Sequence, residues 1–252
     1  MSWKSDHHVV FHVPHDGAQF PPELMSSACI SQGEFMRYHE TMRDTSVTLM
    51  IPDGYRTEEH SVVFPVSRLL CDVERFIGPE EVMELFGMGY CYERAFDGQK
   101  IKNVTEDLKR RTRIYYDGHH KRLDEICMKH EKILLIDLHS FSDEIVPLHF
   151  LKDGEPTPGI CIGTDPGYTP RALTDAATKV FGEAGYSVRE NYPYTGCFVP
   201  NAVMSGRTRC RCASIMLEIN KRVYCDEAGN AVHHELEKLQ GCISDVLANI
   251  SL

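Results

Sequence analysis

The sequence predicts an α/β protein in which helices cover both faces of a mixed or parallel sheet. Two observations support this prediction. Short apolar runs alternate along the chain with segments of helical spacing, and several of the apolar runs end in His, Asp or Glu. The 252 residues suffice for one large α/β domain. Because no Pro-, Gly- or Ser-rich linker divides the chain, we expect a single domain over residues 1–252.

The expected strands are apolar runs that are bounded by turn residues. They lie at residues 8–13, 62–66, 68–73, 132–138, 147–151, 159–162 and 213–219, with a further extended segment from Val188. Pro14 ends the first of them. Apolar runs of this kind are typical of strands that are buried on both faces.

The expected helices show apolar residues at helical spacing and recognisable end signals. They lie at residues 33–50 with a break near Asp44, and at 79–86, 103–129, 170–184 and 230–250. Asn103 and Glu106 form a capping-box pattern before the third of these helices. Asp117-Gly118 interrupts that segment, so one helix and two helices are equally expected. Residues 17–25 contain Gly17, Pro21 and Pro22 and are expected to form a loop.

Composition excludes several classes of function. The net charge of −10 argues against nucleic acid as a partner, because phosphate binding needs clustered Lys and Arg. No run of about 18 apolar residues exists, so we expect no membrane span. The ten Cys are scattered, with Cys210 and Cys212 as the one close pair, which predicts reduced thiols in a cytoplasmic protein. We expect a small acidic molecule as the partner, and the sequence leaves open whether the chain forms a homo-oligomer.

Two histidines follow strand-like runs and are the candidate nitrogen ligands of a metal. His15 follows the first run, and His139 ends the run that begins at Ile133. A catalytic zinc takes three protein ligands and keeps one position for water. Asp72 and Glu74 both offer the third ligand. Glu74 reaches farther, whereas Asp72 would then orient an Arg or a ligand His, and the two assignments stay open.

Acidic and basic side chains near these histidines suggest hydrolysis. Glu218 lies inside an apolar run, where a carboxylate is costly unless its charge is used, and it is the candidate general base. Arg75 could hold a substrate carboxylate, and Arg207 and Arg209 could add a second anion contact. Each has a plainer alternative: histidines at strand ends often only pack, Glu218 could pair with an Arg, and the arginines could form a solvated strand face.

Seven motifs, in this order, resemble the N-formylglutamate amidohydrolase family. They are Val13-Pro14-His15-Asp16-Gly17, Val66-Ser67-Arg68-Leu69 running into Asp72-Val73-Glu74-Arg75-Phe76, Gly87-Met88-Gly89, Asp137-Leu138-His139-Ser140, Cys161-Ile162-Gly163-Thr164-Asp165, Asn191-Tyr192-Pro193-Tyr194-Thr195-Gly196 and Met216-Leu217-Glu218-Ile219-Asn220. Each motif is weak alone, and together they span most of the chain.

The resemblance implies a fold similar to that of the zinc carboxypeptidases, a three-layer α/β/α sandwich around a mixed sheet. It implies hydrolysis of an N-formyl or other N-acyl amino acid, by default N-formyl-L-glutamate to glutamate and formate, and a place in histidine catabolism. One divalent metal, expected to be zinc, would be held by His15 and His139, with Glu218 as the base, Arg75 as the anchor and Asn220 among the substrate-binding residues.

One departure concerns the acidic metal ligand. Carboxypeptidases take it three residues after the first His, where this chain has Ala18. Some members of the resembled family also have Asn at the position of Glu74, which favours Asp72. Two alternatives to the deformylase remain: a carboxypeptidase-like hydrolase of small acidic peptides, and a catalytically inactive protein that binds a metabolite.

Overall fold

The structure is a computed structural model that describes residues 7–146 and 155–250. The chain forms two compact units, each with its own hydrophobic core. The first, here named the sheet unit, consists of Met1–Val13, Ser46–Val62 and Asp124–Leu252. The second, named the loop unit, consists of Pro14–Thr45 and Val63–Leu123. The single domain expected over residues 1–252 stays a prediction.

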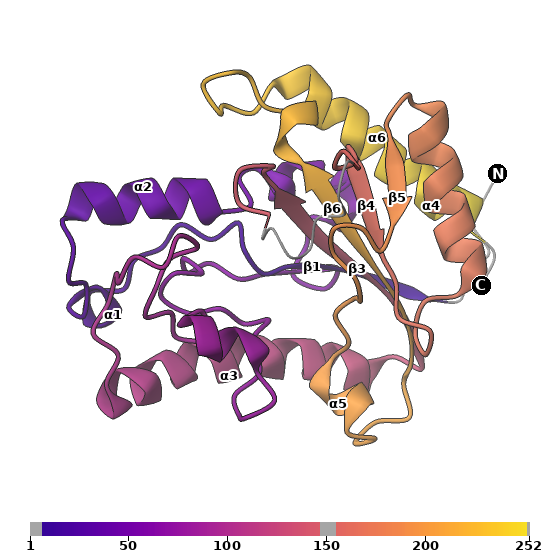
Figure 1. The fold of residues 1–252 in the computed structure, drawn as a ribbon. Helices are drawn as coiled ribbons and strands as arrows, with labels where there is room; N and C mark the ends of the chain where they lie inside the picture. Colours follow the sequence, from indigo (N-terminus) through magenta and orange to yellow (C-terminus); the bar gives the residue numbers. More distant parts are fainter. Residues whose placement is uncertain (1–6, 147–154, 251–252) are drawn as a thin grey trace. The chain divides into compact units, whose positions relative to one another are not determined.

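The described strands form one mixed sheet of six in the order β2-β1-β3-β6-β4-β5 (Figure 1). The strands are β1 (His8–Val13), β2 (Ser61–Val63), β3 (Lys132–Phe141), β4 (Ile160–Gly163), β5 (Val188–Glu190) and β6 (Arg211–Asn220). β1, β3 and β6 are parallel, whereas β4 is antiparallel to β6 and parallel to β5. This arrangement confirms the predicted α/β class with a central mixed sheet.

Helices pack on both faces of this sheet. The described α-helices are α1 (Pro22–Met25), α2 (Gln32–Met42), α3 (Glu106–Lys129), α4 (Arg171–Glu183), α5 (Asn201–Met204) and α6 (His233–Asn249). α6 buries Leu236, Leu239 and Ile243 at helical spacing and, with α4, covers one face. On the other face Cys127 of α3 and Val203 of α5 pack against Ile133. The three-layer α/β/α arrangement is therefore confirmed.

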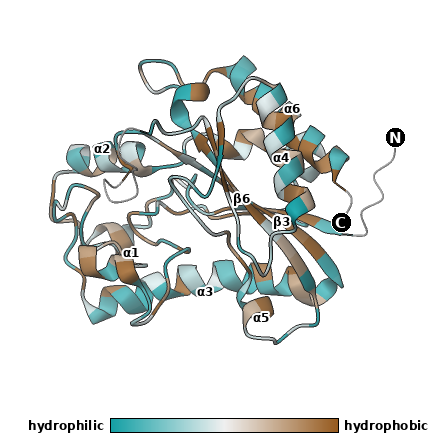
Figure 2. Cartoon of the chain, turned by 45° about the vertical axis from the view of Figure 1, so that its right-hand side comes forward, coloured by the Kyte–Doolittle hydropathy of each residue, from teal (hydrophilic) through white to brown (hydrophobic). Residues whose placement is uncertain are grey.

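The two faces of the sheet differ in chemistry because successive side chains of a strand alternate between them. Leu134, Ile136 and Leu138 of β3 belong to the large apolar cluster that α4 and α6 cover, and Figure 2 shows β3 and β6 as predominantly hydrophobic. The intervening residues of β3 include Asp137 and His139, which face the opposite side. Asp137 and His139 thus share the face opposite the large apolar cluster.

The loop unit has a core of its own, built from α1, α2, the larger part of α3 and the turns between them. Ser31 and Glu34 form a complete capping box at the start of α2, which fixes where that helix begins. The buried face of α2 includes Phe35 and Met42, which belong to this core together with Leu70.

Four 3-10 helices are described in the two units together: Val47–Met50, Asp53–Tyr55, Val82–Phe86 and Lys221–Val223.

One expected strand is wrong, and the difference affects the site. Residues 68–73 form a turn rather than a strand, because the backbone N–H groups of Leu70 and Cys71 donate to the carbonyl oxygen of Ser67 at 2.9 and 3.1 Å. Asp72 and Glu74 therefore do not share one side of a strand. Residues 79–86 contain only the short 3-10 helix that begins at Val82.

The expected helix at residues 103–129 is one helix, and it begins later than the capping pattern predicts. The hydroxyl of Thr105, rather than the side chain of Asn103, accepts from the N–H of Leu108 at 3.2 Å. Gly118 lies inside the helix without ending it. Residues 17–25, expected as a loop, include the short helix α1, and the strand expected at 147–151 lies outside the described residues.

Among residues 7–146 and 155–250, no helix combines the length and the apolarity that a membrane span requires.

Candidate active site

The sheet unit carries a polar cluster on one face, which consists of His12, Asp137, His139 and Glu218. It is named the sheet cluster. In the strand register His12 of β1 lies beside Asp137 of β3, and His139 of β3 lies beside Glu218 of β6. Neighbouring strands are about 4.8 Å apart, so these side chains are adjacent on one face. All four are buried.

Asp137 connects the two imidazoles of the sheet cluster. His12 Nδ1 lies 2.8 Å and His139 Nε2 lies 3.0 Å from its Oδ1, and the backbone N–H of Phe198 donates to its Oδ2 at 2.9 Å. Burial alone would raise the pKa of Asp137, but the bonds and charges of His139 and His12 outweigh it and hold that pKa far below its usual value. Both imidazoles therefore donate to a carboxylate, which fixes their tautomers.

The loop unit carries a second cluster of charges around one buried carboxylate, Asp72. This loop cluster consists of His15, Arg68, Asp72, Glu74, Arg75 and Tyr92. Asp72 Oδ1 lies 2.9 Å from His15 Nε2 and accepts from the N–H of Glu74 at 3.0 Å. Its Oδ2 accepts from Arg68 at 3.0 Å and from the hydroxyl of Tyr92 at 2.7 Å. Each carboxylate oxygen of Asp72 thus has two hydrogen-bonding partners, and the side chain is fully buried.

Charges fix the protonation of the loop cluster. Burial would raise the pKa of Asp72, but the positive charges of His15, Arg75 and Arg68 hold that pKa well below its usual value. Burial and the Arg68 charge lower the pKa of His15, yet the carboxylates of Asp72 and Asp44 outweigh them and raise it above the ordinary value. Asp72 is therefore ionised at neutral pH and anchors its neighbours.

Backbone contacts explain why His15 lies beside Asp72. Gly17 approaches the backbone so closely that a Cβ would lie 2.5 Å from the carbonyl oxygen of Phe64, so only glycine fits there. The carbonyl oxygen of His15 accepts from the N–H of Asp44 at 3.1 Å, next to the C-terminal end of α2. The His15-Asp16-Gly17 motif is thereby fixed between α2 and the 64–67 segment.

Glu74 and Arg75 are the more accessible members of the loop cluster. A Glu74 carboxylate oxygen lies 3.7 Å from His15 Nε2, and its side chain is 16% exposed. Arg75 is 24% exposed, its Nε lies 3.9 Å from Asp72 Oδ2, and within the described residues that Nε makes no hydrogen bond. A buried guanidinium N–H without a hydrogen bond suits an anionic ligand, because it has lost its water without gaining a bond.

Comparison with known proteins identifies the family. The family model described as N-formylglutamate amidohydrolase matches residues 7–225. The chain belongs to the N-formylglutamate amidohydrolase family. This confirms the resemblance in the sequence, and as a member of the family the chain is a hydrolase that acts on amides. A search of curated proteins finds no match.

Solved structures share the fold. The N-formylglutamate amidohydrolase of Ralstonia eutropha JMP134 is 19% identical, with a TM-score of 0.74 over 96% of this chain and 91% of that chain. A gene product of Agrobacterium tumefaciens is also 19% identical, with a TM-score of 0.57 over 96% of this chain and 92% of that chain. At this identity the likeness shows the fold, which agrees with the family assignment.

Most of the sequence-derived site residues of this amidohydrolase lie in two clusters. His139 and Glu218 lie together in the sheet cluster, whereas His15, Asp72, Glu74 and Arg75 lie together in the loop cluster. The described part of the chain thus contains groups of His and carboxylates that could bind a metal ion. Arg207 and Arg209 belong to neither cluster, because they precede the first residue of β6, whereas Glu218 lies near its end.

Two of the remaining candidates, Arg207 and Asn220, make hydrogen bonds within the sheet unit. Arg207 pairs with Asp124 of α3 at 2.7 Å. From Arg211 to Glu218 the strand rises about 23 Å, so Arg207 and Arg209 are remote from the sheet cluster. Asn220 Nδ2 donates to Asp143 at 2.7 Å, and its side-chain oxygen accepts from the N–H of Arg222 at 3.1 Å. Asn220 thus holds the start of the turn after β6.

Sequence reasoning missed His12, Arg68 and Tyr92. His12 lies inside an apolar run, two residues before Pro14, and a buried imidazole in such a run is a usable signal. Arg68 lies four residues before Asp72, yet it was expected on a strand, where that spacing carries no pairing signal. Tyr92 lies 20 residues from its partner Asp72 and leaves no local signal.

Proposed function

We propose that the chain hydrolyses the amide bond of an N-formyl amino acid, by default N-formyl-L-glutamate, and releases formate and glutamate with the help of one divalent metal, zinc. Family membership supports the reaction class. The observation that carries the proposal is the pairing of a buried carboxylate with a buried imidazole on one face of the sheet, Glu218 beside His139. A general base next to a candidate metal ligand is what metal-assisted amide hydrolysis needs.

The donor set fits a zinc ion of the catalytic type. We propose His139, His15 and one acid as the ligands, since two imidazoles and one carboxylate are a common catalytic zinc set. Each proposed His ligand also contacts a second carboxylate, His139 at Asp137 and His15 at Asp72. Contacts of this kind orient metal-binding imidazoles and raise their basicity.

Glu74 is the proposed acidic ligand, and Asp72 the residue that positions its neighbours. Four groups already bind the two oxygens of Asp72, and its side chain is fully buried. Taking Asp72 as a ligand would disrupt an existing charge network. Glu74 keeps 16% exposure and can turn about its longer side chain.

The residues of the chain then divide the reaction between them. A divalent ion at this site would activate a water molecule and polarise the amide carbonyl. Glu218 accepts the proton of the attacking water and returns it to the amine nitrogen as the C–N bond breaks. Arg75 binds a carboxylate of the amino acid, which orients the formamide toward Glu218. The two products are formate and the free amino acid.

The cellular setting follows from the same proposal. All ten cysteines are free thiols, which suits a reducing cytoplasm. Release of glutamate from its formyl derivative would place the enzyme in histidine catabolism.

The deciding experiment measures formate release from N-formyl-L-glutamate by the wild-type protein and by Glu218→Gln. The amide cannot accept a proton, so we expect kcat to fall at least about a hundredfold while zinc content stays at the wild-type value. Near-wild-type turnover of Glu218→Gln would remove Glu218 from the reaction.

A substrate panel separates the proposal from its alternatives. N-acetyl-glutamate and small acidic peptides are tested beside the formyl substrate at equal concentration. Preference for the peptides would indicate a carboxypeptidase-like hydrolase. A wild-type protein that lacks stoichiometric metal and turns over none of the compounds, yet binds an acidic metabolite, would indicate a binding protein.

A further inference from the structure

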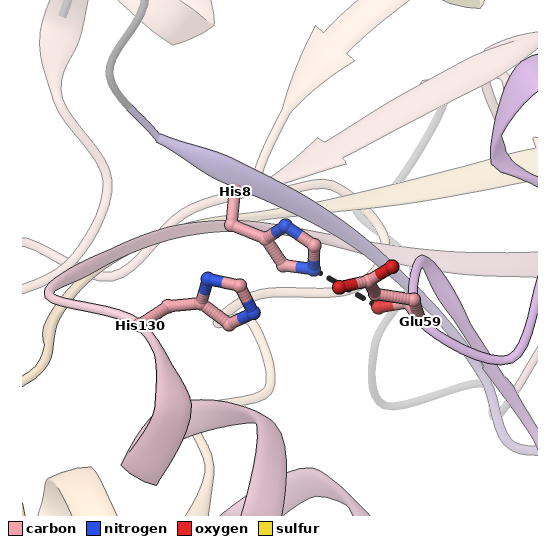
Figure 3. Close-up of side chains that lie close together, drawn as sticks. All are labelled: His8, Glu59 and His130. Carbon is pink, nitrogen blue, oxygen red and sulfur yellow. Dashed lines mark hydrogen bonds between the residues drawn. The ribbon is translucent and has the colours of Figure 1, made fainter.

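A second group of metal-binding side chains lies in the sheet unit, away from the sheet cluster. It consists of His8, Glu59 and His130, whose ligand atoms all lie within 4.8 Å of one another (Figure 3). From these contacts we infer a second metal site, one that binds a zinc-like divalent ion and ties three segments of the sheet unit together. The inference does not depend on the proposed hydrolysis.

The three residues come from segments that are far apart in the sequence. His8 is the first residue of β1, Glu59 lies just before β2, and His130 lies in the connection between α3 and β3. In the register of the parallel strands His8 lies beside Ile133, at the start of β3. From Lys132 to His139, β3 rises about 23 Å, so this group lies at the opposite end of the strand from His139.

Imidazole packing shows that the group is organised. The rings of His8 and His130 stack with centroids 3.7 Å apart and an interplanar angle of 5°. His8 Nε2 donates to the backbone carbonyl of Glu59 at 3.0 Å, so a carboxylate and an imidazole are held on adjacent segments. His8 Nε2 is the ring nitrogen on the Glu59 side (Figure 3), so a metal bound there would replace this hydrogen bond, with the ring proton on Nδ1 instead.

A third imidazole adjoins the group. His60 stacks on His8 with ring centroids 4.4 Å apart. Its Nδ1 donates to the carbonyl oxygen of Val9 at 2.7 Å, which places its own lone pair on Nε2. Three imidazoles beside one carboxylate favour zinc, copper or nickel, whereas calcium and magnesium prefer oxygen ligands.

Metal binding would require the side chains of the group to rotate. On a tetrahedral zinc with bonds of about 2.0 Å, neighbouring ligand atoms lie about 3.3 Å apart. Spacings of at most 4.8 Å must therefore contract by about 1.5 Å or less. Glu59 is exposed and both histidines are partly exposed, so their side chains have room to rotate. The parallel rings of His8 and His130 must unstack on binding, because an imidazole lone pair lies in the plane of its ring.

The experiment counts zinc per chain after loading and dialysis, by elemental analysis, for the wild-type protein and for His130→Ala, His8→Ala and Glu59→Gln. We expect each histidine variant to hold one zinc fewer than wild type and Glu59→Gln to bind that zinc at least about tenfold more weakly. Because Glu59 is exposed, Glu59→Gln tests the site without a risk to folding. Formate release should be unchanged in all three variants.

Two controls keep this site separate from the proposed catalytic metal. His233→Ala removes an exposed histidine that also lies near a carboxylate, Glu237 at 3.3 Å, and should leave the zinc count unchanged. His139→Ala removes a proposed catalytic ligand and should lower the count independently, so that the double variant with His130→Ala loses both ions. Failure of the hydrolysis proposal would remove the formate readout and would leave the zinc counts expected for His8→Ala, His130→Ala and Glu59→Gln unchanged.

Two results would overturn the inference. One is an unchanged zinc count in His8→Ala, His130→Ala and Glu59→Gln together. The other is an equal loss in His233→Ala, which would mean that zinc binds surface histidines without selection.

Discussion

At the scale of single residues, Asp72 and Glu74 differ in how firmly each carboxylate is held. Asp72 compensates the charges of two arginines and one histidine, and every one of these groups is largely buried. The Glu74 carboxylate lies 3.7 Å from His15 Nε2, and its side chain is 16% exposed, whereas that of Asp72 is fully buried. Replacing each carboxylate by its amide therefore separates a positioning role from a ligand role.

We expect Glu74→Gln to lower zinc affinity at least about tenfold and to leave the unfolding free energy of the metal-free protein within about 0.5 kcal/mol of wild type. Asp72→Asn should instead destabilise the metal-free protein by about 3–5 kcal/mol, because buried positive charges lose their partner. Zinc titration and urea unfolding in EDTA check both. The reverse pattern would make Asp72 the ligand.

Some site residues can be predicted from the sequence because their signals are local. His139 and Glu218 lie inside or at the end of apolar runs, where a polar side chain needs a reason. Asp137, two residues before His139, is predictable as its partner, and the 3.0 Å contact confirms this. Tyr92 could not be assigned in this way, since its partner lies 20 residues away and no local signal marks it. His12 carries the local signal of an apolar run, but its partner Asp137 lies 125 residues away.

At the scale of elements, α6 illustrates a helix that is held by one apolar face. Leu239 is fully buried in the main cluster, and its neighbours along the face are Leu236 and Ile243. We expect Leu239→Ala to lower the unfolding free energy by about 2–5 kcal/mol, through lost burial and a residual cavity.

Leu85→Ala is the matched control, because Leu85 is 87% exposed and its truncation should change stability by no more than about 0.5 kcal/mol. Thermal and urea unfolding measure both variants. Equal effects of the two truncations would contradict the packing described for α6.

The elements with strong periodicity are those that the sequence predicts well. β1 and α6 match their expected ranges closely, because their apolar spacing is set by burial on one face. The segment at 68–73 is equally apolar but forms a turn that is buried in the loop unit. An apolar run indicates that a segment is buried, but it does not by itself predict the backbone conformation.

At the scale of the whole molecule, each unit contains a buried, ionised aspartate. The pKa values of Asp72 in the loop unit and Asp137 in the sheet unit are depressed in the folded state. Such a carboxylate stabilises the fold at pH values above its unfolded pKa of about 3.9, and this contribution is lost as the pH falls toward the folded-state pKa.

We therefore expect the urea midpoint of the metal-free protein to decrease steeply as the pH falls from about 5 to about 2.5. His15 has the opposite sign: its raised pKa adds stability below about 6.5 that is lost as the pH rises through the folded-state value. Circular dichroism in urea series with EDTA follows both. A midpoint that stays constant below pH 5 would contradict the assigned charges.

The division into two units is the feature that the sequence hides most completely. The loop unit is assembled from two segments inserted among those of the sheet unit, and no change of composition marks the four crossings, which lie at Val13–Pro14, Thr45–Ser46, Val62–Val63 and Leu123–Asp124. The boundary at Leu123–Asp124 even lies inside the continuous helix α3. Compact units of this kind are defined by long-range contacts, which local patterns do not encode.

Each unit contains buried cysteines whose reactivity would indicate when that unit opens. Cys71 and Cys91 are enclosed in the loop unit, and Cys161 and Cys242 in the sheet unit. Burial raises the pKa of the Cys161 thiol to about 12, so a folded sheet unit shields it from alkylation. The order in which maleimide reaches these four sulfurs would reveal whether the two cores open together or in turn.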